Sequence, residues 1–250
     1  MPIVKVKRED ILREDEFREM LNKLEGKDTI IGEYETTLHG EPVVQKFRIE
    51  CKQTQCLLCL LWIFGKRIQE ILLLRRKDLY VEDGFLFVDF IVLKKKKRKS
   101  VRERYTKRIT LEHPYTHYIT DYMSSINEPN AYIFPGESRP RKFVSKVNVY
   151  GYSTDEKGNV RRKLKDTKIY QYERSERGFM SSQLAWKIIK FLNPNVYPHL
   201  FRHSLATRMA KHSFTEDQLM SWFDWDSPKI AHEYVERGPR LTEQASRRTW

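Results

Sequence analysis

Apolar residues recur at helical spacing along most of the chain, and this pattern predicts a mainly helical protein. The segment Asp10–Leu24 keeps this spacing and ends at Gly26. The longest such segment, Arg48–Leu74, has an almost continuous apolar face and predicts the central core helix. Further helices are predicted at Tyr115–Ile126, Met180–Leu192, Pro198–Ala210, Thr215–Phe223 and Ser227–Val235.

From Leu79 the apolar pattern changes, and strands are predicted at Leu79–Val81, Phe85–Leu93 and Arg108–Leu111. The segment 28–47 predicts a short hairpin or loop. The basic segment 139–178 predicts either a flexible insertion or a small β excursion. Together these patterns predict an α+β fold, mainly α, with a small three-stranded antiparallel sheet. We expect residues 1–250 to form one domain that carries both insertions.

The composition of the 250-residue chain excludes several classes of protein. No run approaches the ~20 apolar residues that span a bilayer, so no membrane partner is expected. The first ten residues lack the apolar centre of a secretory signal. The three cysteines, an odd number, lie together in the predicted core helix, which favours an intracellular, cytoplasmic protein.

The pair Cys56 and Cys59 resembles half of a zinc site. No second pair of cysteines or histidines follows at ligand spacing, so we interpret these thiols as buried apolar groups. No carboxylate cluster suggests a metal either, and no cofactor is expected.

Basic residues outnumber acidic ones, with 47 Lys and Arg against 34 Asp and Glu, a formal net charge of +13. A highly charged solvated surface would account for such a balance. The clustering of the surplus instead favours a nucleic-acid partner. The candidate DNA-binding residues are Lys94, Lys96, Lys97, Arg98, Arg139, Arg141, Lys142, Arg161 and Arg162.

His199 and Arg202 are three residues apart in the helix that is predicted to begin at Pro198, so they share a face near its N-terminus. Such a face suits a phosphate group. Taken alone, the two residues could equally be an ordinary surface pair on a basic protein.

Other residues give this pair a context. Upstream, Gly65, Arg67, Glu70 and Leu74 follow the pattern G-x-R-x-x-E-x-x-x-L. Downstream, Trp225 precedes Tyr234 by nine positions. Phe134 and Pro135 form an apolar turn before the H-x-x-R segment. The ordered set resembles the tyrosine recombinase, or phage integrase, family over about Ile11 to Val235.

The resemblance implies the catalytic-domain fold of that family and the cleavage and rejoining of double-stranded DNA through a 3′-phosphotyrosine, without metal or ATP. It assigns to Arg67 and Arg202 the clamping of the phosphate oxygens, which a bidentate guanidinium does better than an ammonium. His199 would bind the same phosphate and help to deprotonate the tyrosine. Trp225 would donate its indole N–H and pack, and Tyr234 would be the nucleophile, a phenol whose pKa of ~10 requires nearby positive charge.

The family also uses a lysine from the loop between the second and third strands as the general acid. Here that loop begins with Lys94 and Lys95, and the spacing from Arg67 favours Lys95, with Lys94 next. Glu70 is expected to orient Arg67, and His203 is expected to be a buried supporting residue.

Some features depart from the family pattern. No separate N-terminal core-binding domain is expected, because the first catalytic-domain helix begins near residue 10. Lys66 occupies a position that is commonly apolar, and Asp224 replaces a glycine. The segment Gly238–Trp250 could pack on its own chain or dock on a neighbour, as such tails do in the family's tetramers.

The sequence therefore predicts a site-specific DNA recombinase or integrase of an archaeal mobile element or its host, associated with the nucleoid and acting as a homotetramer on DNA. Two alternatives stay open: a DNA-relaxing enzyme of the type IB topoisomerase kind, and a basic DNA-binding accessory protein without catalytic activity.

Overall fold

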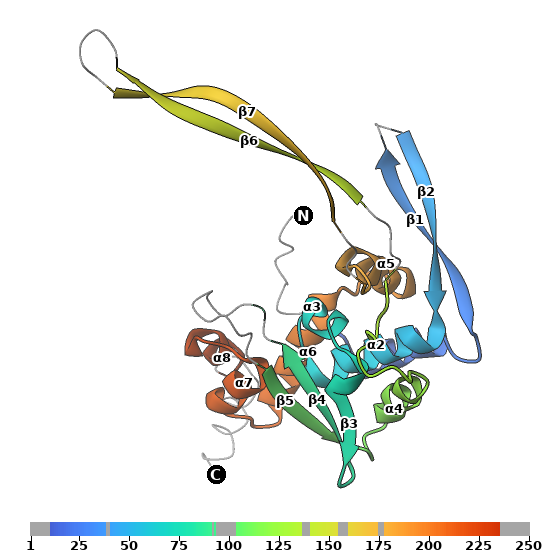
Figure 1. Cartoon of the computed structure of the whole chain (residues 1–250). Helices are drawn as coiled ribbons and strands as arrows, with labels where there is room; N and C mark the ends of the chain where they lie inside the picture. Colours follow the sequence, from blue (N-terminus) through green and yellow to red (C-terminus); the bar gives the residue numbers. More distant parts are fainter. Residues whose placement is uncertain are drawn as a thin grey trace. The chain divides into compact units, whose positions relative to one another are not determined.

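The computed structural model describes residues 11–38, 41–91, 93, 104–136, 141–154, 160–174 and 178–235 (Figure 1). These residues form two compact units. One unit is built from the described residues on either side of the segment 136–178, and the other is that segment itself. The larger unit is an α+β structure in which helices surround a central helix and a small antiparallel sheet lies beside them, so the predicted fold class is confirmed.

The centre of the larger unit is α2 (Cys51–Phe64), in which every residue except Lys52 is buried. A helix that is apolar on nearly all sides is expected to lie inside a protein. The helix ends at Gly65, whose φ of 57° is left-handed and gives the chain a sharp C-cap. The prediction of one helix over Arg48–Leu74 is therefore wrong: a strand continues to Glu50, and a separate short helix α3 (Ile68–Leu72) follows the turn.

The N-terminal helix α1 (Glu14–Asn22) packs on this core through aromatic rings. Phe17 stacks on Trp62 of α2, with 4.3 Å between ring centroids, and meets Phe201 edge-on. Just before α1, the backbone N–H of Leu12 donates a 2.8 Å hydrogen bond to Ser204 Oγ. These contacts join the start of the described chain to helices α2 and α6 (Pro198–Lys211).

The predicted three-stranded antiparallel sheet forms in the order β3 (Leu79–Glu82), β4 (Phe85–Ile91) and β5 (Arg104–Thr110). In β4 the buried residues alternate with less buried ones, as expected for a sheet with one face on the core. A short 3-10 helix, Arg76–Asp78, leads into β3, and helix α4 (Thr116–Ser124) follows β5 and packs on α2.

A hairpin of β1 (Thr29–Leu38) and β2 (Glu41–Glu50) precedes α2. It packs against α5 (Ser182–Leu192), where Tyr34 meets Trp186 edge-on. The second unit is also a two-stranded antiparallel hairpin, of β6 (Arg141–Thr154) and β7 (Val160–Arg174), with a bulge between Val149 and Tyr150.

The described chain ends with three helices, α6, α7 (Glu216–Phe223) and α8 (Pro228–Val235). A small cluster of buried residues holds them together, made of Ala206, Met209, Ala210, Leu219, Phe223 and Ala231. The cluster packs the C-terminal half of α6 against α7 and α8, while Arg202 and His203, earlier in α6, bond to Phe223 at the end of α7 and to Tyr234 near the end of α8. Among the described residues, no helix has the length and apolar character needed to cross a bilayer.

Candidate active site

Arg202 lies almost fully buried in α6, with only 4% of its surface exposed. Its guanidinium donates hydrogen bonds to two backbone carbonyls, with Nη1 3.1 Å from Gly65 O and Nη2 2.6 Å from Phe223 O. The group also lies over the rings of Phe223 and Trp225, 4.9 and 5.5 Å from their centroids. Two separate turns of the chain therefore fix the orientation of this side chain.

Arg67 begins α3 and is held by Glu70 in the same turn. Glu70 accepts hydrogen bonds from the Arg67 backbone N–H (3.0 Å) and from Arg67 Nη1 (2.9 Å), which is the contact expected from the sequence. The glutamate side chain is 2% exposed and the arginine side chain 25%. Glu70 thus leaves part of the Arg67 guanidinium open to solvent and to a ligand.

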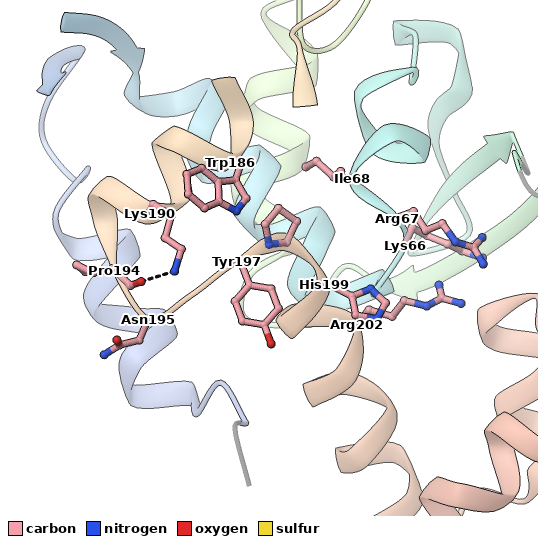
Figure 2. Close-up of a pocket in the computed structure, with 11 residues that line it drawn as sticks. Lys66, Arg67, Ile68, Trp186, Lys190, Pro194, Asn195, Tyr197, His199 and Arg202 are labelled. Atoms are coloured by element: carbon pink, nitrogen blue, oxygen red, sulfur yellow. Dashed lines mark hydrogen bonds between the residues drawn. The ribbon is translucent and has the colours of Figure 1, made fainter. Parts of the chain in front are cut away.

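His199 lies in the first turn of α6 and is exposed. With Arg67 and Arg202 it lines a cavity of about 500 Å³. Figure 2 shows these three side chains on one side of the cavity, with Trp186, Lys190 and Tyr197 on the other. The cavity thus joins a cationic side, which suits an anion, to a side rich in aromatic rings.

Tyr234 in α8 stacks on Trp225, with 5.4 Å between ring centroids and an interplanar angle of 10°. Its hydroxyl lies 2.9 Å from Nδ1 of His203, the residue that follows Arg202 in α6. Since Trp225 also faces the Arg202 guanidinium, a continuous series of contacts leads from the cavity to the phenol.

Burial shifts the pKa values of both Arg202 and Tyr234. Burial lowers the pKa of Arg202 to about 10, and the nearby positive charge of Arg67 adds to the effect. Burial raises the pKa of Tyr234, which the charge of Arg202 partly opposes. Two guanidiniums that repel each other beside a cavity favour an anion between them, because the anion relieves both the repulsion and the desolvation.

Lys66, another of the residues that line the cavity, forms a buried ion pair with Asp224. The ammonium is fully buried and the carboxylate 5% exposed, and Lys66 Nζ also donates to Trp222 O (3.1 Å). Burial lowers the pKa of Lys66 to about 8, although the carboxylate of Asp224 opposes this shift. Both residues depart from the sequence pattern described above, and the structure brings them together.

The phage integrase family profile matches residues 43–239 of the chain. The chain belongs to the phage integrase family. Among solved structures, this integrase-family chain resembles the XerH site-specific recombinase bound to difH substrate (TM-score 0.54, 12% identity, covering 98% of this chain and 56% of XerH). It also resembles XerA recombinase (TM-score 0.51, 13% identity, 95% and 65% covered).

A third similar structure is the Tn1549 transposon integrase in complex with transposon right end DNA (TM-score 0.51, 12% identity, 98% and 67% covered). The integrase-family chain thus spans between about half and two thirds of the length of these proteins. A search of the curated proteins found no match.

Several residues predicted from the sequence of this integrase-family chain are not placed. Lys94–Lys97, which include the expected general acid Lys95, lie outside the described residues, as do Arg98 and Arg139. The strands β6 and β7 place the backbone of Arg141, Lys142, Arg161 and Arg162, but not their side chains. Within the described ranges, no group of three or more His, Cys, Asp or Glu is arranged to hold a metal ion. The three cysteines are free and buried, as expected.

Two contacts at the site are not predicted from the sequence: His203 with Tyr234, and Lys66 with Asp224. The sequence predicts only a buried supporting role for His203, whereas the structure leaves this residue partly exposed and places its Nδ1 2.9 Å from the Tyr234 hydroxyl. The sequence shows Lys66 and Asp224 only as two separate departures from the family pattern, whereas the structure pairs them. The signal that could have suggested the pairing is their opposite charge, since Lys66 directly precedes Arg67 and Asp224 directly precedes Trp225.

Proposed function

We propose that this chain is a site-specific DNA recombinase that cuts a DNA strand with Tyr234 and holds the end as a 3′-phosphotyrosine. One observation supports this most: the phenol of Tyr234 stacks on Trp225, which faces Arg202 at the cavity that Arg67 and His199 also line. These contacts connect the side chains that line the cavity to the proposed nucleophile, although Trp225 and Tyr234 do not line the cavity themselves.

In the proposed step the Tyr234 oxygen attacks the phosphorus, and the bond from phosphorus to the 5′-oxygen breaks. Negative charge grows on the non-bridging oxygens, which the forked donors of Arg67 and Arg202 would stabilise. The phosphodiester is exchanged for a phosphotyrosine, so the 5′-hydroxyl can attack in the reverse direction without ATP. His199 would donate a hydrogen bond to the same phosphate from the first turn of α6.

Two protons must move in this step. The phenol loses one, and its hydroxyl lies 2.9 Å from His203 Nδ1. We therefore propose that His203 Nδ1 accepts the phenol proton, while His199 donates a hydrogen bond to the phosphate. The leaving 5′-oxygen needs the other proton, which the resemblance to the family assigns to Lys95 or Lys94.

The proposed partner is duplex DNA. The net charge of +13 supports it, because binding that neutralises backbone phosphates releases counterions. The proposed contacts with the DNA backbone are Lys94, Lys96, Lys97, Arg98, Arg139, Arg141, Lys142, Arg161 and Arg162. The homotetramer, the docking of the tail Gly238–Trp250 and an association with the nucleoid stay predictions from the sequence.

The test is the capture of a covalent DNA adduct. The chain is incubated with a library of duplexes that have random sequence and a nick on one strand, so that the short cleaved fragment diffuses away and the adduct accumulates. Adducts are separated under denaturing conditions, the modified residue is identified by mass spectrometry, and the DNA is sequenced. We expect a phosphotyrosine at Tyr234 and an enriched DNA sequence.

Tyr234→Phe should abolish the adduct, whereas the matched control Tyr80→Phe, on strand β3 of the sheet, should keep it. Arg202→Ala should also abolish the adduct while keeping most of the DNA affinity, since affinity is spread over many phosphates. Adducts without an enriched sequence, together with relaxation of any supercoiled plasmid, would favour the topoisomerase alternative. Tight DNA binding with no adduct would favour the accessory protein.

A further inference from the structure

The last turn of α7 is held by cations from three other elements. The final carbonyls of a helix have no partner within it and carry partial negative charge. Here each of the last three accepts a hydrogen bond from a basic side chain: Ser221 O from Lys107 (2.6 Å), Trp222 O from Lys66 (3.1 Å) and Phe223 O from Arg202 (2.6 Å). The end of α7 is therefore a meeting point for β5, α6 and the turn after α2.

Asp224 supplies the negative charge at this point. Its carboxylate pairs with Lys66 and lies 4.0 Å from the ammonium of Lys107, whose side chain is 12% exposed. Asp224 itself has a left-handed φ of 53°, which is unusual for a residue with a side chain and ends α7 in a tight turn. An aspartate tolerates this conformation better than most residues.

The ion pair is directly connected to the groups that hold Arg202. Arg202 bonds Gly65 O and Phe223 O, and the next residue after each carbonyl is a member of the pair, Lys66 and Asp224. The pair thus joins the two peptide segments that fix the guanidinium. Trp225, on which Tyr234 stacks, follows Asp224 directly.

We propose that Lys66 and Asp224 are positioning residues, whose ion pair locks the last turn of α7 against the turn after α2 and so fixes Arg202 and Trp225 at the cavity. The expected effect on DNA cleavage rests on the proposed function. The expected effect on the orientation of the Arg202 guanidinium does not. A buried pair that only added stability would be replaceable by apolar residues without effect on geometry.

The experiment compares three forms of the full chain. Asp224→Asn keeps the left-handed turn but removes the charge, which leaves Lys66 buried without its counterion. The double variant Lys66→Met, Asp224→Asn removes both charges and restores stability, because no unpaired charge stays buried. The matched control Asp78→Asn removes another buried carboxylate charge, which pairs at 2.5 Å with the half-exposed Arg104.

The first measurement needs no DNA. In ¹⁵N–¹H spectra, the Arg202 guanidinium, held by two carbonyls, should give protected, slowly exchanging Nη protons, assigned by their loss in Arg202→Lys. We expect these signals to be lost in Asp224→Asn and in the double variant, and to persist in Asp78→Asn. Their persistence in a stable double variant would overturn the proposal.

The second measurement is the single-turnover rate of adduct formation on a captured DNA sequence. We expect the double variant to be about 10- to 100-fold slower than the unmodified chain at unchanged DNA affinity, as for a misplaced catalytic group. A rate restored along with stability would overturn the positioning role. If the unmodified chain forms no adduct, the proposed function fails, while the guanidinium spectra still decide the role of the ion pair.

Discussion

Replacing Gly65 by alanine tests whether the turn after α2 is packed as closely around Arg202 as the structure indicates. A Cβ at this position would lie 2.8 Å from Phe223 Cε1, 2.9 Å from Leu205 Cδ2 and 3.4 Å from the Arg202 Cα. The residue also has a φ of 57°, which alanine adopts only with strain.

The expected loss has two parts. The left-handed conformation costs alanine about 1–2 kcal/mol. Forcing a methyl group against the buried ring of Phe223 adds about 1–3 kcal/mol, as for other overpacked cores. The free energy of unfolding should therefore fall by roughly 2–5 kcal/mol.

Two other glycines serve as matched controls. Gly26 and Gly84 also have positive φ, 68° and 78°, but a Cβ at either would have nothing within 4 Å. Alanine there should cost only the backbone strain, about 1–2 kcal/mol. The assay is urea unfolding followed by tryptophan fluorescence, with the m value checked for each variant. A loss for Gly65→Ala no larger than for Gly84→Ala would refute the close packing.

Three further predictions follow from other contacts. Ser204→Ala should lower the free energy of unfolding by about 1–3 kcal/mol in the same assay, because the buried N–H of Leu12 loses its acceptor; an unchanged midpoint would contradict this. Burial raises the pKa of the Cys56 and Cys59 thiols, so a thiol reagent should label them only as the protein unfolds, and rapid labelling of the native chain would disprove their burial. Because the pKa of Tyr234 is raised, the folded state keeps the phenol proton at alkaline pH while the unfolded state releases it. The contribution of Tyr234 to the free energy of unfolding is therefore complete below pH ~10 and is lost above it. Unfolding measured against pH should show a steeper alkaline fall in the free energy of unfolding for the unmodified chain than for Tyr234→Phe, and identical slopes would argue against the shift.

Local periodicity was sufficient for most of the secondary structure. The helices α5, α6, α7 and α8 and the strands β3 and β4 lie close to where the sequence predicts them, because helix and strand spacing are properties of neighbouring residues. Strand β5 begins at Arg104, four residues before the predicted start. The single helix over Arg48–Leu74 was wrong because its apolar pattern continues through Gly65, where the backbone turns left-handed. A glycine followed by the motif arginine was the local sign of that end.

The candidate site divides in the same way. The sequence alone gives the order and spacing of the motif residues, which are enough to suggest the family: Arg67, His199, Arg202, Trp225 and Tyr234. Only the tertiary structure decides that the Tyr234 hydroxyl meets His203, 31 residues away, or that Lys66 pairs with Asp224, 158 residues away. The physical reason is that a helix period constrains partners only a few residues apart, whereas pairing across the fold depends on which elements pack together and on which buried charges then need a counterion.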